Sequence, residues 1–199
     1  MTLHFAKGSE STVLDEDDTR RALNDVYDSL GKRDRVIVVP PDFTRLHSRA
    51  GELTCMTNDY YEDSLVDILP ALGTHAPMST DQLDAMYPGI PTSKFREHRW
   101  REDVVKVGEV PESFVSQVTE GIWNKPWPAQ MNKLIWEGDH DLIISIGQVV
   151  PHEVIGMANY NKNIFIGTGG ASSINESHFI GASYGLSLIH ISEPTRPER

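Results

Sequence analysis

Hydrophobic residues recur along this chain with two different periods, and each period predicts a different kind of element. Apolar residues at helical spacing predict a helix over 15–30, which opens with an acidic stretch and is followed by Gly31. Ser79 is a suitable N-cap for a short helix that runs to Met86. A further helix is predicted over 171–180, directly after a glycine-rich turn.

Short apolar runs between these helices predict strands. The predicted strands cover 36–39, 65–72, 95–100, 104–110, 142–146 and 164–166. Residues 113–131 fit neither period, and within them we expect 123–128 to form a loop. Because strands alternate with helices, the sequence predicts an α/β fold with a partly parallel sheet and flanking helices.

The end of the chain differs in kind from the rest. The run from Leu186 to Arg196 resembles the translation of a transposase end sequence used in sequencing-library preparation. We therefore expect residues 186–199 to be adapter read-through and exclude them from the fold. On this interpretation the natural protein continues beyond Gly185, and residues 1–185 form its N-terminal α/β domain.

Composition narrows the class of protein. Apolar residues make up 39% of the chain and charged residues 24%, which is typical of a soluble globular domain. The net charge of −11 disfavours nucleic-acid binding, which needs clustered basic residues. Cys55 is the only cysteine, so no intrachain disulfide can form. No signal peptide or membrane-spanning run is present in the sequence, and we expect a cytoplasmic protein without a membrane partner.

Residues with reactive side chains come soon after the predicted strands. Asp42 and Arg45 follow the strand at 36–39, and His75 follows the strand at 65–72. His152 lies a few residues beyond the strand at 142–146. Functional residues of α/β sheets gather in loops at the carboxyl ends of strands, so we expect these side chains to lie close together.

Each of these residues also has an ordinary structural interpretation. Asp42 and Arg45 could pair with each other, or Arg45 could bind a carboxylate or phosphate through its planar guanidinium. A histidine such as His75 or His152 is most often a structural residue, although an imidazole in such a loop is well suited to acid–base catalysis.

Three features further along the chain leave the same choice open. Lys162 lies among asparagines and a tyrosine, which favours a polar loop over a helix face. His178 is either a surface residue of its helix or a metal ligand. The segment Gly167–Gly170 could cradle a phosphate, or it could be a tight strand-to-helix turn, since it lacks the lysine of phosphate-binding loops and the full dinucleotide-binding pattern.

In order and spacing, these positions resemble the nickel-dependent lactate racemase family. The loop Asp42-Phe-Thr-Arg45 is similar to the family's Asp-His-Thr-Arg loop, with a phenylalanine at the second position as the departure. The segment Gly73–Thr80 resembles the one that carries the family's first catalytic histidine. His152, Lys162 and His178 are spaced as in the family, and the resemblance covers residues 35–185.

The resemblance implies an isomerase, a racemase or epimerase of a 2-hydroxy acid that is either lactate or a larger acid. It implies that His75 and His152 are the two acid–base residues. It also implies that Arg45 binds the substrate and that His178 is the nickel ligand. A second, C-terminal domain would complete the active site, so the piece contained in this chain is expected to be inactive alone.

The resemblance also implies an organic cofactor. This is pyridinium-3-thioamide-5-thiocarboxylic acid mononucleotide, which binds nickel and is known as the nickel-pincer nucleotide. Lys162, Asp42 and Thr44 would hold it, with Lys162 bonded to it.

Two other functions remain open from the sequence. His75, His152 and His178 could be the three ligands of a zinc hydrolase, although the short zinc motif HExxH does not occur. Alternatively, Arg45 and the turn Gly167–Gly170 could bind an anion in a module without catalytic activity.

Overall fold

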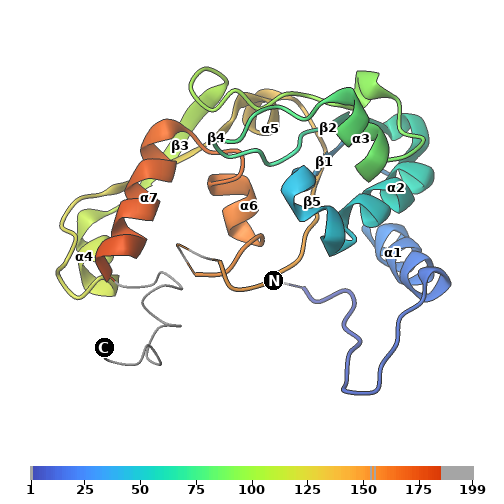
Figure 1. Cartoon of the computed structure of the whole chain (residues 1–199), viewed down its shortest axis with the longest axis horizontal. Coiled ribbons are helices and arrows are strands. Elements are labelled where there is room, and N and C mark those ends of the chain that lie inside the picture. The colour runs from blue at the N-terminus through green and yellow to red at the C-terminus, as the bar shows by residue number, and fades with distance from the viewer. Residues whose placement is uncertain (1, 153, 155, 185–199) are drawn as a thin grey trace, which may run out of the picture.

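The computed structural model describes residues 2–152, 154 and 156–184 (Figure 1), and the predicted read-through segment at 186–199 lies outside these described residues. The elements are, in chain order, α1 (Glu16–Leu30), β1 (Val36–Val39), η1 (Phe43–Ser48), α2 (Ala50–Tyr61), η2 (Glu62–Ser64), β2 (Leu65–Ile68), α3 (Thr80–Met86), η3 (Thr92–Lys94), β3 (Val104–Val110), α4 (Glu112–Val118), β4 (Trp127–Asn132), α5 (Lys133–Glu137), β5 (Leu142–Ser145), α6 (Asn161–Phe165) and α7 (Ala171–Tyr184).

Strand β1 is the centre of a three-stranded parallel sheet with the order β2-β1-β5. All four of its side chains are fully buried, as expected of a parallel strand that is covered on both faces. A separate antiparallel pair is formed by β3 and β4. The predicted α/β fold with a partly parallel sheet and flanking helices is therefore confirmed.

The two faces of β1 contribute to two hydrophobic cores. Val36 and Val38 pack with the apolar residues of α1, α2 and α3. Ile37 and Val39 pack on the opposite face with Met131 of β4 and with α5 and α6. The alternation of side chains along a strand thus joins both layers of the domain to one buried element.

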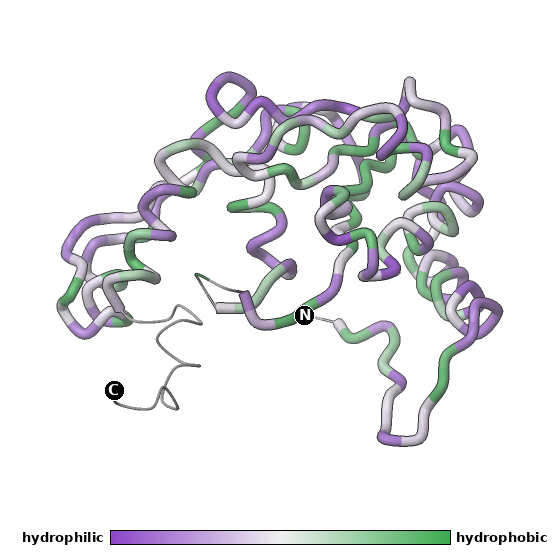
Figure 2. Tube along the Cα trace, viewed as in Figure 1, coloured by the Kyte–Doolittle hydropathy of each residue, from purple (hydrophilic) through white to green (hydrophobic). Residues whose placement is uncertain are grey.

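Helix α1 forms as its sequence predicts. The Asp15 side chain accepts a hydrogen bond from the Asp18 N–H group at 2.7 Å, and the acidic first turn suits the positive end of the helix dipole. Gly31 follows the last turn with a φ of 72°, which glycine adopts easily. Hydrophilic and hydrophobic positions alternate along this helix in Figure 2, in keeping with its one buried face.

Three predicted elements need correction. Strand β2 ends at Ile68 rather than at residue 72, although Ala71 still forms a single parallel bridge with Pro41. The predicted strand at 95–100 is wrong, because only Phe95 forms a bridge. The predicted strand at 164–166 is also wrong, because its first two residues lie in α6. An apolar run this short does not distinguish a buried strand from a buried helix.

The segment without a prediction, 113–131, contains most of α4 and β4. The expected loop at 123–128 is wrong for its last two residues, because β4 begins at Trp127. Helix α2 was not predicted either, and it packs closely on the end of α3. A Cβ atom on Gly51 would lie 2.1 Å from the carbonyl oxygen of Met86, so only glycine fits this contact. None of the helices in the described part of the chain has the length and apolar character needed to cross a membrane.

Candidate functional site

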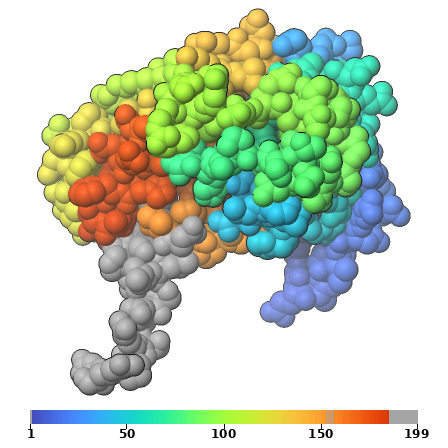
Figure 3. All heavy atoms as spheres, turned by 45° about the horizontal axis from the view of Figure 1, so that its top comes forward, coloured from blue at the N-terminus to red at the C-terminus, as the bar shows by residue number. Residues whose placement is uncertain are grey.

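A pocket of about 230 Å³ lies where the loops after β1, β2 and β5 meet. Its walls come from stretches far apart in sequence, at 41–48, at 71–75, between 147 and 167, and in α7. Figure 3 shows the corresponding coloured segments next to one another on the surface. Because parallel strands place the loops that follow them at one edge of the sheet, distant residues meet here.

Every residue predicted to carry function lines this pocket. The residues are Asp42, Thr44, Arg45, His75, His152, Lys162 and His178. The prediction that the loop residues gather at the carboxyl ends of the strands is therefore confirmed. Their chemical roles remain predictions.

Asp42 is buried at the start of the loop after β1, with 6% of its surface exposed. One carboxylate oxygen accepts hydrogen bonds from the backbone N–H and the hydroxyl group of Thr44, so Asp42 is the N-cap of η1. The other oxygen accepts a hydrogen bond from Nδ1 of His75. The carboxylate therefore connects the loop after β1 to the loop after β2.

Backbone contacts hold these two loops at a fixed distance. The N–H group of Leu69 donates to the carbonyl of Val38 at 2.9 Å, and that of Ala71 donates to Pro40 at 2.8 Å. The Tyr87 hydroxyl donates to the carbonyl of Pro41 at 2.7 Å, and burial raises the pKa of this hydroxyl, so it stays a donor. The contact between Asp42 and His75 is thus a consequence of the pairing of β1 with β2.

His152, which follows β5, and His178 of α7 both line the pocket, with 6.1 Å between their ring centroids. Nδ1 of His178 donates to the carbonyl oxygen of Ile174 at 2.8 Å. In the neutral ring, Nε2 is then the nitrogen with a lone pair. Histidines that bind metals commonly use this arrangement, in which the second nitrogen donates to a carbonyl.

Lys162 lies on the short helix α6, so the predicted polar loop is wrong at this position. Its neighbour Asn163 is buried and donates from Nδ2 to the carbonyl of Val39 at 2.8 Å and to the Ser145 hydroxyl at 3.0 Å. These bonds fasten α6 to the ends of β1 and β5. Asn163 was not among the predicted site residues, and its only sequence signal is its position beside Lys162.

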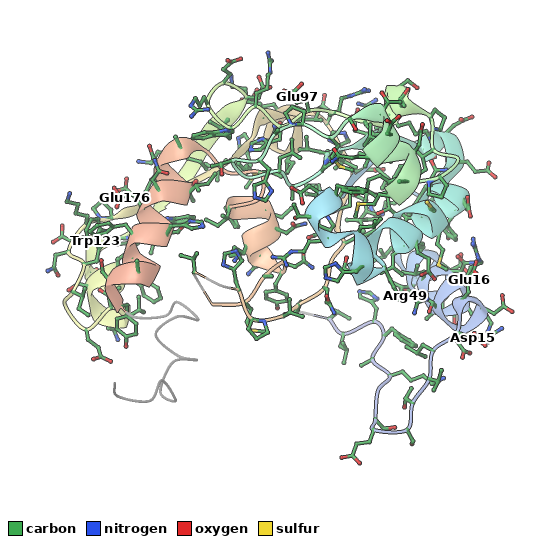
Figure 4. The ribbon with its side chains drawn as sticks, viewed as in Figure 1. Asp15, Glu16, Arg49, Glu97, Trp123 and Glu176 are labelled. Carbon is green, nitrogen blue, oxygen red and sulfur yellow. The ribbon has the colours of Figure 1, made fainter. Side chains whose placement is uncertain are left out.

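Helix α7 is held by β4 and by the loop before it. The Trp127 indole donates to the carbonyl of Ser173 at 3.0 Å, and the Gln130 side chain accepts from the N–H group of Ser173 at 3.1 Å. Figure 4 shows Trp123 and Glu176 near each other at this helix, and the Trp123 ring packs on Phe179. These contacts fix α7, and with it His178, relative to the sheet.

The glycine turn before α7 is a tight structural turn. The N–H of Gly169 donates to the carbonyl of Ile166 at 3.1 Å, and that of Gly170 donates to the Ser173 hydroxyl at 3.2 Å. A Cβ atom on Gly169 would come within 2.3 Å of a carbonyl oxygen. Because these donors are used internally, the structure favours the tight turn over the phosphate cradle.

His98, a second residue that was not predicted to matter, contacts this turn. It is 2% exposed, donates from Nε2 to the carbonyl of Gly169 at 3.0 Å and accepts from Asn132 at 2.9 Å. Burial lowers the pKa of the imidazole below its usual value of 6.5. The neutral ring therefore links the turn before α7 to β4 through two hydrogen bonds.

The pocket is cationic in an acidic chain. The net charge is −11, yet among the described lining residues Arg45 and Lys162 are cations and Asp42 is the one carboxylate. An anionic ligand is therefore favoured at this site. Among residues 2–152, 154 and 156–184, no three His, Cys, Asp or Glu side chains are grouped to hold a metal ion. The three-histidine zinc site is thus not formed in this structure.

The fold and the pocket define an α/β domain with a cationic pocket beyond the carboxyl ends of its parallel strands. The chain belongs to the lactate racemase N-terminal domain family, which matches residues 12–184. A comparison with curated protein sequences gave no match.

Two solved structures are similar to this chain. A protein from Thermotoga maritima is 27% identical with a TM-score of 0.73, and the match covers 90% of this chain and 43% of that one. The lactate racemase apoprotein from Thermoanaerobacterium thermosaccharolyticum is 19% identical with a TM-score of 0.59, over 88% of this chain and 46% of that one. The chain thus spans less than half the length of either protein.

Proposed function

We propose that this chain carries the cofactor-binding half of a nickel-dependent 2-hydroxy-acid racemase or epimerase. The observation that carries the proposal is the convergence of a lysine and three histidines on one cationic pocket. The remainder of the natural protein, a C-terminal domain, would close the site and complete the selection of the substrate, which is lactate or a larger 2-hydroxy acid.

The donor set fits the nickel-pincer nucleotide. Such a group brings a carbon and two sulfurs to the nickel, so the protein has to supply only one nitrogen. Nε2 of His178 suits that role because Nδ1 of the same ring donates to the carbonyl of Ile174. Lys162 lines the same pocket as Asp42 and Thr44 and would anchor the organic part. When bound, the cofactor would accept hydride from the α-carbon of the substrate and return it.

The order of the strands supports a role for two bases. Arg45 lies after the central strand β1, while His75 and His152 follow the outer strands β2 and β5. Arg45 would hold the substrate carboxylate between two imidazoles. Either imidazole can take the hydroxyl proton, and two are needed because the enantiomers direct their hydroxyl groups differently.

Intact mass spectrometry tests the proposal. The chain is co-expressed with the enzymes that make the cofactor, in medium with nickel. We expect a covalent mass increase that Lys162→Ala abolishes and that Lys32→Ala, an exposed lysine outside the pocket, retains. His178→Ala should keep the organic adduct and lose the nickel, as measured by metal analysis.

Other outcomes point to the other functions. The absence of both adduct and nickel would overturn the proposal. Zinc that is lost together in His75→Ala, His152→Ala and His178→Ala would favour the hydrolase. Anion affinity that is unchanged in Lys162→Ala and His178→Ala, but lost in Arg45→Ala, would favour a binding module without catalytic activity.

A further inference from the structure

Asp42 occupies an unusual place for a residue expected to touch a ligand. Its carboxylate is almost fully buried, and the side chain is 8% exposed, whereas that of His75 is 57% exposed. Both oxygens are already engaged, one by Thr44 and one by the imidazole. The carboxylate therefore lies behind the histidine as seen from the solvent-exposed side of the pocket.

This contact determines which ring nitrogen carries the proton. A carboxylate accepts hydrogen bonds, so Nδ1 of His75 must be the donor. The neutral ring then has its lone pair on Nε2, the nitrogen that Asp42 does not contact. Two donors from Thr44 fix the orientation of the carboxylate, and the β1–β2 pairing fixes its position.

We propose that Asp42 is a positioning residue that holds His75 in the Nδ1–H tautomer, so that Nε2 is the proton acceptor in the pocket. The inference rests on the proposed function and deepens it. When the substrate hydroxyl loses its proton, the O–H bond breaks and an N–H bond forms at Nε2. The nearby carboxylate then stabilises the imidazolium ion.

The Asp42→Asn variant tests the tautomer directly, because it replaces an acceptor beside Nδ1 of His75 with a donor. The two donors of Thr44 would bind the oxygen of the new amide, which turns its NH₂ group toward Nδ1 of His75. An NH₂ group donates, so Nδ1 would have to accept and the proton would move to Nε2. We therefore expect the substitution to invert the tautomer of one histidine.

The measurement is a long-range ¹H–¹⁵N correlation spectrum of the 199-residue chain, at a pH where imidazoles are neutral. His75→Gln assigns the signals. The wild type should show a protonated Nδ1, and Asp42→Asn a protonated Nε2. Thr44→Val keeps the carboxylate and should keep the wild-type tautomer, and Asp84→Asn controls for the change in net charge. His140 provides an internal contrast, because its Nε2 donates to Asp67.

A wild-type spectrum with the proton on Nε2 of His75 would overturn the inference, even if Asp42→Asn does not fold. An unchanged tautomer in a folded Asp42→Asn variant would overturn it as well. The spectra need no cofactor, so they do not depend on the mass increase at Lys162. The tautomer of His75 and the cofactor adduct at Lys162 can therefore each be refuted without refuting the other.

Discussion

His98 links two segments through a single buried imidazole, and its protonation should couple to stability. Burial lowers the pKa of the folded-state ring below 6.5. As the pH falls through 6.5, the unfolded chain binds a proton that the folded chain does not, so the free energy of unfolding decreases. For one such group the slope cannot exceed about 1.4 kcal/mol per pH unit. Urea unfolding at a series of pH values measures this slope.

A matched pair of variants isolates the contribution of His98. His98→Gln removes the titrating group, so its slope below pH 6.5 should be shallower than that of the wild type. Above pH 7, where the ring is neutral in both states, the loss of buried hydrogen bonds should cost about 1–3 kcal/mol, and this difference should narrow as the pH falls. His4→Gln changes an exposed histidine and should leave the slope unchanged. Equal slopes in His98→Gln and the wild type would show that His98 does not contribute to the pH dependence of stability.

At the scale of elements, Asn163 fastens α6 to the parallel sheet. Asn163→Ala removes two side-chain hydrogen bonds, to the carbonyl of Val39 and to the Ser145 hydroxyl, at a cost of about 1–3 kcal/mol in unfolding free energy. Because Lys162 is the preceding residue, we also expect a smaller yield of the lysine adduct. Asn161→Ala changes an exposed asparagine of the same helix and should alter neither quantity. Chemical denaturation and intact mass together check both expectations.

The same helix shows what the sequence could and could not predict. Helix α1 and strand β1 were predictable because the first has caps and a clear period, and the second is apolar throughout. Helix α6 is five residues long and owes its form to packing against β4 and to Asn163, which no local pattern encodes. Helix α2 depends on the close approach at Gly51, a contact with a residue far along the chain.

The candidate site was more predictable than the elements around it. Loops after parallel strands converge whatever the exact strand lengths, so placing Asp42, His75 and His152 after strands was sufficient. The contact between Asp42 and His75 was not predictable, because it depends on the register of β1 against β2. Residues 33 positions apart in sequence meet only once that register is set.

At the scale of the whole molecule, the pocket of this chain is cationic but remains open. His75 keeps 57% of its side chain exposed, although proton and hydride transfer proceed best where water is excluded. The two solved relatives are about twice as long as this chain, and under the proposed function a C-terminal domain supplies the remaining wall of the pocket. We therefore expect binding of the cofactor and turnover of the substrate to be separable in this chain.

The chain loaded with cofactor should show the adduct at Lys162 and yet racemise no 2-hydroxy acid. Chiral chromatography of single enantiomers of lactate and of larger aliphatic, aromatic and sugar acids measures turnover. A longer version of the protein with the same adduct is the positive control, and its Lys162→Ala variant sets the background. Racemisation by the loaded chain above that background would show that the walls described here already form a complete active site.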